Sequence, residues 1–214
     1  MNGTGTKYLG ELFALGGRVR DTISVRLRPE GSIKYNISKY ISWAFRDAGL
    51  HNRPNAIPVH TIYDMQKGQS TRSALGEVNC QLISLAHRYR DSLRLTPSVE
   101  DPPTTGNEQR APKAQYRLGC SFPVLIGFLI CGPIVAVTTL DSSPAVYPDL
   151  DAANCKLVSQ FDMGDESQDV WNTLAIAIVC IRIRKTMLQL EEEGKGEWIW
   201  AIDDSTGANA DEDI

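Results

Sequence analysis

The longest run of the chain without a charged residue covers 23 positions, from Leu118 to Leu140. A membrane-spanning helix needs about 20 apolar residues, so one interpretation is a single span through a bilayer. The dipeptide Gly132-Pro133 in the middle of the run favours a turn, because glycine has a permissive backbone and proline fixes φ and lacks an N–H donor. The flanking arms are rich in Val, Ile, Phe and Thr, which suit strands. The pattern therefore predicts a β-hairpin over 123–140, with the spanning helix as the alternative.

Two long helices are predicted on either side of this hairpin. Between 71 and 92, apolar residues recur at steps of 3, 4, 3 and 4, and Ser70 or Thr71 is placed to cap the first turn. Between 168 and 192, apolar residues from Trp171 to Ile181 lie all around the helix, with Ser167 or Asp169 as the cap. A helix that is apolar on every side is predicted to be buried on most sides.

Shorter elements are predicted from hydrophobic spacing and from glycine and proline positions. They are a helix over 8–13 that stops at Gly16-Gly17, a strand over 23–27, a helix over 37–45 that closes near Gly49, a strand over 56–63 weakened by Pro58, a strand over 156–161, and a closing strand over 198–202 with Trp198 and Trp200 on one face.

Together these elements predict an α+β fold, with a mainly antiparallel sheet centred on the 123–140 hairpin and packed by helices 71–92 and 168–192. Residues 1–94 form a basic N-terminal part, and residues 95–113, with four prolines, form a linker. Residues 114–203 form the sheet and the long helix, in one domain with the N-terminal part. Residues 204–214 are an acidic tail.

Charge is distributed unevenly along the chain. The net charge is −4, but residues 1–113 carry 16 Lys/Arg and 10 Asp/Glu, whereas residues 114–214 carry 6 and 16. A basic half can attract nucleic acid or an acidic partner, and two halves of opposite sign can also attract each other. The five cysteines are scattered and no signal peptide is recognised, which predicts reduced thiols in a cytoplasmic or nuclear protein with no membrane association.

Candidate chemistry is sparse. His60 with Asp64 is the best general-base pair by proximity, and a structural histidine is the favoured interpretation. Carboxylates gather between Asp141 and Asp169 without the spacing of a calcium loop. The cysteines lack zinc spacing, and three of them, Cys80, Cys131 and Cys180, are predicted to be small core residues. No residue is assigned to catalysis, to a metal or to a cofactor.

The order of elements resembles that of PD-(D/E)XK nuclease-like domains: helix 71–92, strands near 115–120, 123–131, 134–140 and 156–161, then a long helix. Gln160-Phe-Asp-Met followed by Asp169-Val-Trp171 is similar to the tails of uncharacterised nuclease-like proteins of filamentous fungi. The resemblance covers about the last two thirds of the chain.

Such a family needs an acid entering the second core strand and a Glu-x-Lys on the third, which hold Mg²⁺ and position a water. The matching strands here, 124–130 and 134–139, contain neither an acid nor a lysine, and Glu193-Gly-Lys195 follows a helix end. The resemblance therefore implies the fold with its chemistry lost.

A patterned core without a convergent catalytic constellation predicts a non-enzymatic protein-binding or regulatory domain that acts through a partner interface or self-association. The candidate contact residues are Arg88, Arg90, Arg94, Trp198 and Trp200, because arginine and aromatic side chains dominate interfaces. The alternatives are a divergent metal-dependent nuclease or hydrolase that uses acids of the 141–169 loop, and a nucleic-acid-binding protein that acts through the basic half.

Overall fold

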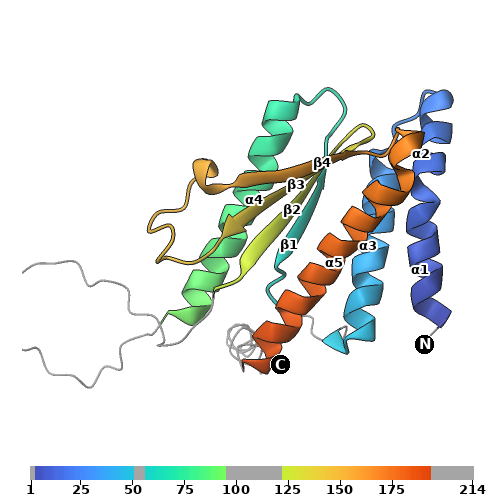
Figure 1. Ribbon diagram of the computed structural model, residues 1–214. Helices are drawn as coiled ribbons and strands as arrows, with labels where there is room; N and C mark the ends of the chain where they lie inside the picture. Colours follow the sequence, from blue (N-terminus) through green and yellow to red (C-terminus); the bar gives the residue numbers. More distant parts are fainter. Residues whose placement is uncertain (1–2, 51–55, 95–121, 194–214) are drawn as a thin grey trace, which may run out of the picture.

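The computed structural model describes residues 3–50, 56–94 and 122–193 (Figure 1). Its helices are α1 (Gly3–Phe13), α2 (Leu15–Ser24), α3 (Glu30–Asp47), α4 (Thr71–Leu93) and α5 (Asp169–Glu192). Its strands are β1 (His60–Asp64), β2 (Val124–Cys131), β3 (Ile134–Asp141) and β4 (Lys156–Asp162). Two 3₁₀ turns, η2 (Ala152–Asn154) and η3 (Glu166–Gln168), lie on either side of β4. The predicted linker 95–113, the closing strand 198–202 and the tail 204–214 lie outside the described residues.

The predicted hairpin is confirmed. Strands β2 and β3 pair antiparallel from Val124 opposite Asp141 to Cys131 opposite Ile134. Gly132 turns the chain with a φ of +58°, a conformation that L side chains rarely adopt. Six of the eight residues of β2 are buried, as its near-continuous apolar sequence indicates, whereas β3 has four buried and four half-buried residues.

The membrane alternative has no counterpart in the part of the chain that is described. Across residues 3–50, 56–94 and 122–193, no helix combines the length and the apolar character needed to cross a bilayer.

The sheet is mixed, so the prediction of a mainly antiparallel sheet is wrong. The strand order is β1-β2-β3-β4, and β1 pairs parallel with β2 from His60 opposite Ile126 to Asp64 opposite Ile130. Parallel neighbours need a long crossover, and α4 lies between these two strands in the chain. The hydrophobic pattern located a strand near 56–63 but carried no information on its direction.

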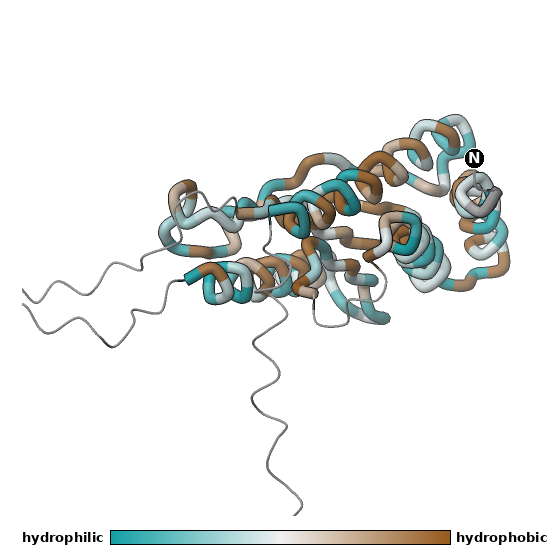
Figure 2. The backbone as a smooth tube through the Cα atoms, turned by 90° about the horizontal axis from the view of Figure 1, so that it is seen from below, coloured by the Kyte–Doolittle hydropathy of each residue, from teal (hydrophilic) through white to brown (hydrophobic). Residues whose placement is uncertain are grey.

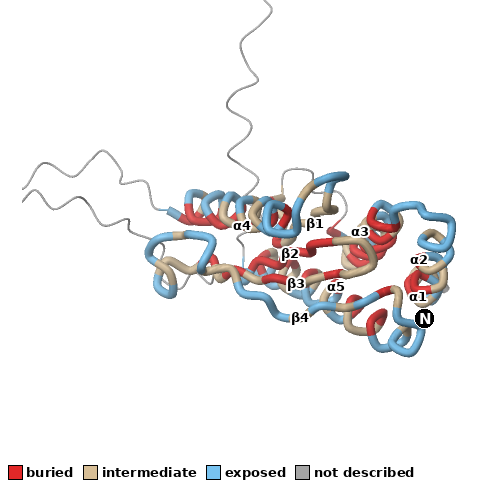
Figure 3. Tube along the Cα trace, turned by 90° about the horizontal axis from the view of Figure 1, so that it is seen from above, coloured by how far each residue is buried: buried red, intermediate tan, exposed pale blue. Residues whose placement is uncertain are grey.

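Helices cover both faces of the sheet, with α4 on one face and α3 and α5 on the other (Figures 1 and 3). The backbone of α4 comes close to β2 at Gly127, where a Cβ would lie 2.8 Å from Val78 Cγ1 and 3.1 Å from Leu82 Cδ1. Hydrophobic stretches run along the sheet and along the helices beside it (Figure 2). The largest fully buried side chains, Tyr89 and Phe128, come from α4 and β2.

The N-terminal region is helical where a strand was predicted. Helix α2 extends to Ser24, so the strand over 23–27 is wrong, and Gly16-Gly17 lies inside this helix. Gly16 is needed there because a Cβ at this position would lie 2.0 Å from Asp169 Oδ1 at the start of α5. The alternation over 23–27 is not matched by burial, since Val25 and Leu27 are both exposed.

The long helices agree with their predicted bounds. Helix α4 begins at Thr71, and Ser70 caps it by accepting a hydrogen bond from Ser73 N. Helix α5 begins at Asp169 without a side-chain cap, and the nearest capping bond is donated to Asp165 by Ser167 N in η3. The predicted helix over 37–45 lies inside α3, and Gly49 follows it with a φ of +75°.

Candidate functional site

Helix α5 is apolar around its circumference, but only one side of it is covered. Buried residues of α5 include Ile176, Cys180, Ile183, Met187 and Leu190. On the opposite side Trp171 and Ile178 are each 68% exposed and Ile181 is 38% exposed. The prediction that this helix is buried on most sides is therefore wrong. An apolar sequence allows every face of a helix to be buried. The packing of the other elements decides which of these faces is covered.

Apart from Val170 in the first turn, which is 53% exposed, the exposed apolar residues of α5 lie in one line. Trp171, Leu174, Ile178 and Ile181 follow one another at steps of 3, 4 and 3, the spacing that places side chains on one helix face. We call these four residues the α5 stripe. Leu174 is half-buried between its exposed neighbours. The stripe extends over about three turns, roughly 15 Å of helix.

Charged residues bound the stripe at both ends. Asp165 and Glu166, both exposed, precede α5, and the exposed Arg182 and Lys185 follow Ile181 within about one turn. The stripe therefore has an acidic end and a basic end. Such a rim of polar groups around an apolar centre is typical of protein interfaces.

Contacts on the buried side fix the direction in which the stripe points. Arg20 donates two hydrogen bonds to Asp169, of 2.9 and 2.8 Å, and Asn172 Nδ2 donates to Asp162 O at 2.7 Å. About three turns beyond Asn172, Arg184 pairs with Asp47 of α3 at 3.0 Å. Helix α5 is thus attached to α2, β4 and α3, and the stripe is held outward before any partner binds.

Strand β4 adds exposed apolar side chains at the edge of the described sheet. Leu157 and Val158 are both exposed, and Val158 is an extra residue between two registers of pairing with β3. Figure 3 shows most of β4 in the colour of exposed residues. The bond from Asn172 to Asp162 joins the end of β4 to the first turn of α5.

The contact residues predicted from the sequence do not form one surface. Arg88 and Arg94 of the α4 end are exposed, but Arg90 is only 7% exposed. Its guanidinium donates to three backbone carbonyls, those of Ser142 at 2.8 Å, Pro148 at 3.0 Å and Tyr147. Arg90 therefore fixes the loop after β3 onto α4. Trp198 and Trp200 lie outside the described residues.

His60 and Asp64 have separate environments. The ring of His60 packs edge-on against Phe45 at a centroid distance of 5.8 Å, and its buried Nδ1 has no hydrogen-bond partner among the described residues. Burial lowers the pKa of His60 to about 4. Burial opposes ionisation of Asp64, but the 2.6 Å bond from Lys34 outweighs it and lowers the pKa of that carboxyl. Asp64 lies four residue steps from His60 along the strand, about 13 Å, so the two residues do not form a catalytic pair.

Five of the seven carboxylates between 141 and 169 are used in local turns or in an ion pair. Asp141, Asp151, Asp162 and Asp165 each accept a hydrogen bond from a backbone N–H two residues further along the chain. Asp169 pairs with Arg20. Within the described ranges, no three His, Cys, Asp or Glu side chains gather in a way that could hold a metal ion.

The cysteines differ in burial. Cys180 is buried in α5, and burial raises the pKa of its thiol, as expected for a core cysteine. Cys131 is half-buried, whereas Cys80 is exposed on α4, so its predicted place in the core is wrong. Its neighbours Val78 and Leu82 are buried, and Cys80 lies on the outer side of α4.

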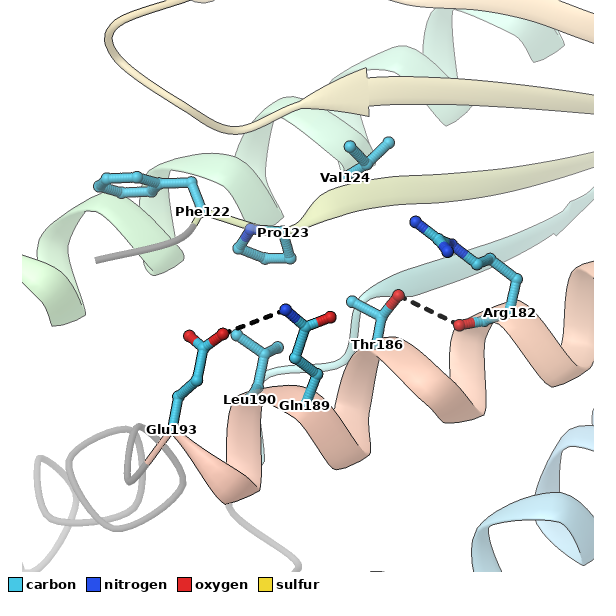
Figure 4. Close-up of a pocket in the computed structure, with 8 residues that line it drawn as sticks. All are labelled: Phe122, Pro123, Val124, Arg182, Thr186, Gln189, Leu190 and Glu193. Carbon is cyan, nitrogen blue, oxygen red and sulfur yellow. Dashed lines mark hydrogen bonds between the residues drawn. The ribbon is translucent and has the colours of Figure 1, made fainter. Parts of the chain in front are cut away.

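A pocket of about 220 Å³ lies between the start of β2 and the C-terminal half of α5 (Figure 4). Its lining combines Phe122, Pro123, Val124 and Leu190 with Arg182, Thr186, Gln189 and Glu193. Two of the polar groups bond within α5, Thr186 to the Arg182 carbonyl and Gln189 to Glu193, each at 3.1 Å. Because Thr186, Gln189 and Glu193 already bond within α5, few polar groups of the lining are left to bind a ligand. The α5 stripe is therefore the better candidate for the functional site.

No family model, curated protein or solved structure matches this chain. The resemblance to PD-(D/E)XK nuclease-like domains therefore stays a prediction.

The sequence contains a signal for the α5 stripe that the prediction of a helix buried on most sides did not use. Helix α5 carries more apolar residues than one buried face needs, and one of them is a tryptophan. A large surplus of this kind predicts either complete burial or a second apolar contact.

Proposed function

We propose that the protein is a protein-binding domain that contacts its partner through the α5 stripe. The observation that carries the proposal is the exposure of Trp171 and Ile178, two large apolar side chains on one face of a well-anchored helix. Burying a side chain of this size contributes roughly 1.5–3 kcal/mol. Tryptophan is also enriched among the residues that contribute most to protein interfaces.

Rigidity supports the same conclusion. The bonds from Arg20 to Asp169 and from Arg184 to Asp47 hold α5 in place, so little conformational freedom is lost when the stripe is covered. The stripe is narrow and continuous, which suits a helix or a shallow apolar groove on a partner.

Photo-crosslinking from inside the stripe tests the proposal. Benzoylphenylalanine at position 178 in the full chain is expected to give a discrete adduct in extracts of cells that express the protein. Excess wild-type protein should compete for this adduct, whereas a Trp171→Glu variant should not. The same label at the exposed position 88 on α4 is the matched control. A label at 178 that gives no competed adduct contradicts the proposal.

The enzymatic and nucleic-acid alternatives call for separate measurements. Hydrolysis by acids of the 141–169 loop predicts Mg²⁺- or Mn²⁺-dependent DNA cleavage that Asp162→Ala or Asp165→Ala abolishes. Binding through the basic half predicts salt-dependent affinity that falls on neutralising the exposed Arg88 and Arg94. The engagement of the acids in turns and of Arg90 in a loop contact favours the protein-binding role.

A further inference from the structure

The geometry of α5 points to a specific partner for the stripe: a second copy of this chain, with the two α5 helices packed antiparallel about a two-fold axis. This inference rests on the proposed function and adds the identity and orientation of the partner. It is carried by two features of α5, the spacing of its apolar residues and the placement of charge at its ends.

The spacing matches the contact line of paired helices. Steps of 3, 4 and 3 residues from Trp171 to Ile181 place one apolar residue in each layer along such a line. Consider an antiparallel pair whose two-fold axis crosses the contact at the level of residue 176. In this pair Trp171 faces Ile181 of the second copy, and Leu174 faces Ile178 of the second copy. The two-fold axis repeats both contacts, so the N-terminal half of the stripe in each copy covers the C-terminal half in the other copy.

The charges select the antiparallel orientation. Asp165 and Glu166 lie at the N-terminal end of the stripe, and Arg182 and Lys185 lie at its C-terminal end, all four exposed. Antiparallel packing brings the acidic end of each copy to the basic end of the other, whereas parallel packing would place like charges together. The helix dipoles also favour the antiparallel pair. The stripe and its rim are thus self-complementary.

The size of the stripe sets the expected strength. Four side chains on each copy form a contact at the low end of the range for specific interfaces, which corresponds to a reversible dimer. We expect half-dissociation at roughly 10 µM. The protein should therefore change between monomer and dimer over a concentration range that is easy to reach.

Sedimentation velocity of the purified full chain tests the inference. Concentrations from about 1 to 200 µM bracket the expected dissociation constant of the dimer. The expected result is a concentration-dependent shift from one chain of 23.6 kDa to twice that mass. Trp171→Glu and Ile178→Glu should each weaken the dimer by about 30-fold or more, the effect of removing an interface anchor. Leu75→Glu is the control for a new glutamate at an exposed apolar position, because Leu75 lies on α4, on the other face of the sheet from α5.

A charge exchange tests the orientation. Glu166→Lys and Lys185→Glu should each weaken the dimer about 5-fold, because each places like charges at both ends of the contact. The double variant should restore the wild-type dissociation constant, which a loss of folding could not do. Circular dichroism and thermal melting of each variant check that the fold is kept.

Several outcomes overturn the inference. A protein that stays monomeric at 200 µM excludes self-association, and a dimer unaffected by Trp171→Glu forms through another face. A double variant that fails to recover excludes the antiparallel arrangement. If the purified protein is monomeric but the label at 178 still gives a competed adduct with a different protein, self-association fails and the proposed protein-binding role stands. If there is neither dimer nor adduct, both fail.

Discussion

At the scale of single residues, Arg90 was predicted to contact a partner, but in the structure it holds a loop of its own chain. Its guanidinium donates to the carbonyls of Ser142, Tyr147 and Pro148, so Arg90→Met leaves three acceptors without that donor. We expect unfolding free energy to fall by about 3 kcal/mol, whereas Arg88→Met on the exposed side of α4 should change it by less than about 0.5 kcal/mol. Urea denaturation of both variants measures the difference, and equal effects would contradict the assigned role.

His60 makes stability depend on pH. Its pKa is about 4 in the folded protein and 6.5 as an ordinary histidine, so the unfolded chain takes up the proton first as the pH falls. The stabilisation is complete above about pH 6.5 and is lost as the pH falls toward 4, with a loss of about 2 kcal/mol by pH 5.

Replacing this histidine removes the dependence. His60→Leu should flatten the decline in unfolding free energy between pH 7 and pH 5. Denaturant titrations of the wild-type protein and the variant at pH 7, 6 and 5 give the two profiles. An unchanged slope in His60→Leu would show that another group causes the acid sensitivity.

At the scale of elements, the close approach of α2 to α5 depends on Gly16. A methyl group there would lie 2.0 Å from Asp169 Oδ1 and displace the carboxylate from Arg20. Gly16→Ala is therefore expected to destabilise the fold by about 1–3 kcal/mol, the usual range for overpacking. Gly10→Ala in α1 has open space and should stabilise by up to about 1 kcal/mol through helix propensity. Thermal melting that moves both variants in the same direction would refute this explanation.

The elements that the sequence pattern predicted are those with local causes. The hairpin follows from Gly132-Pro133 between β-rich arms, and α4 follows from its apolar spacing and the Ser70 cap. The strand over 23–27 was wrong because a five-residue alternation is weak and the glycines before it suit close helix packing. The direction of β1 and the uncovered side of α5 depend on tertiary contacts, which hydrophobic spacing does not contain. For the same reason the burial of Arg90 was not predictable.

At the scale of the whole molecule, the two layers of helices protect the strands unequally. Strand β2 is central and buried, whereas β4 is exposed along most of its length. Hydrogen exchange at concentrations below the dimer range should therefore be slowest in β2 and fastest in β4 among the four described strands. Protection of β4 equal to that of β2 would mean that a further part of the chain covers it.

The extra residue at Val158 has a consequence for how copies of this protein can associate. An unbroken outer strand would present a regular row of N–H and C=O groups onto which the strand of another molecule could add, and such addition can continue without limit into a fibril. The bulge interrupts that row in the middle of β4. Growth of the sheet from molecule to molecule is therefore disfavoured on this side, and an assembly that closes after two copies has less competition from aggregation.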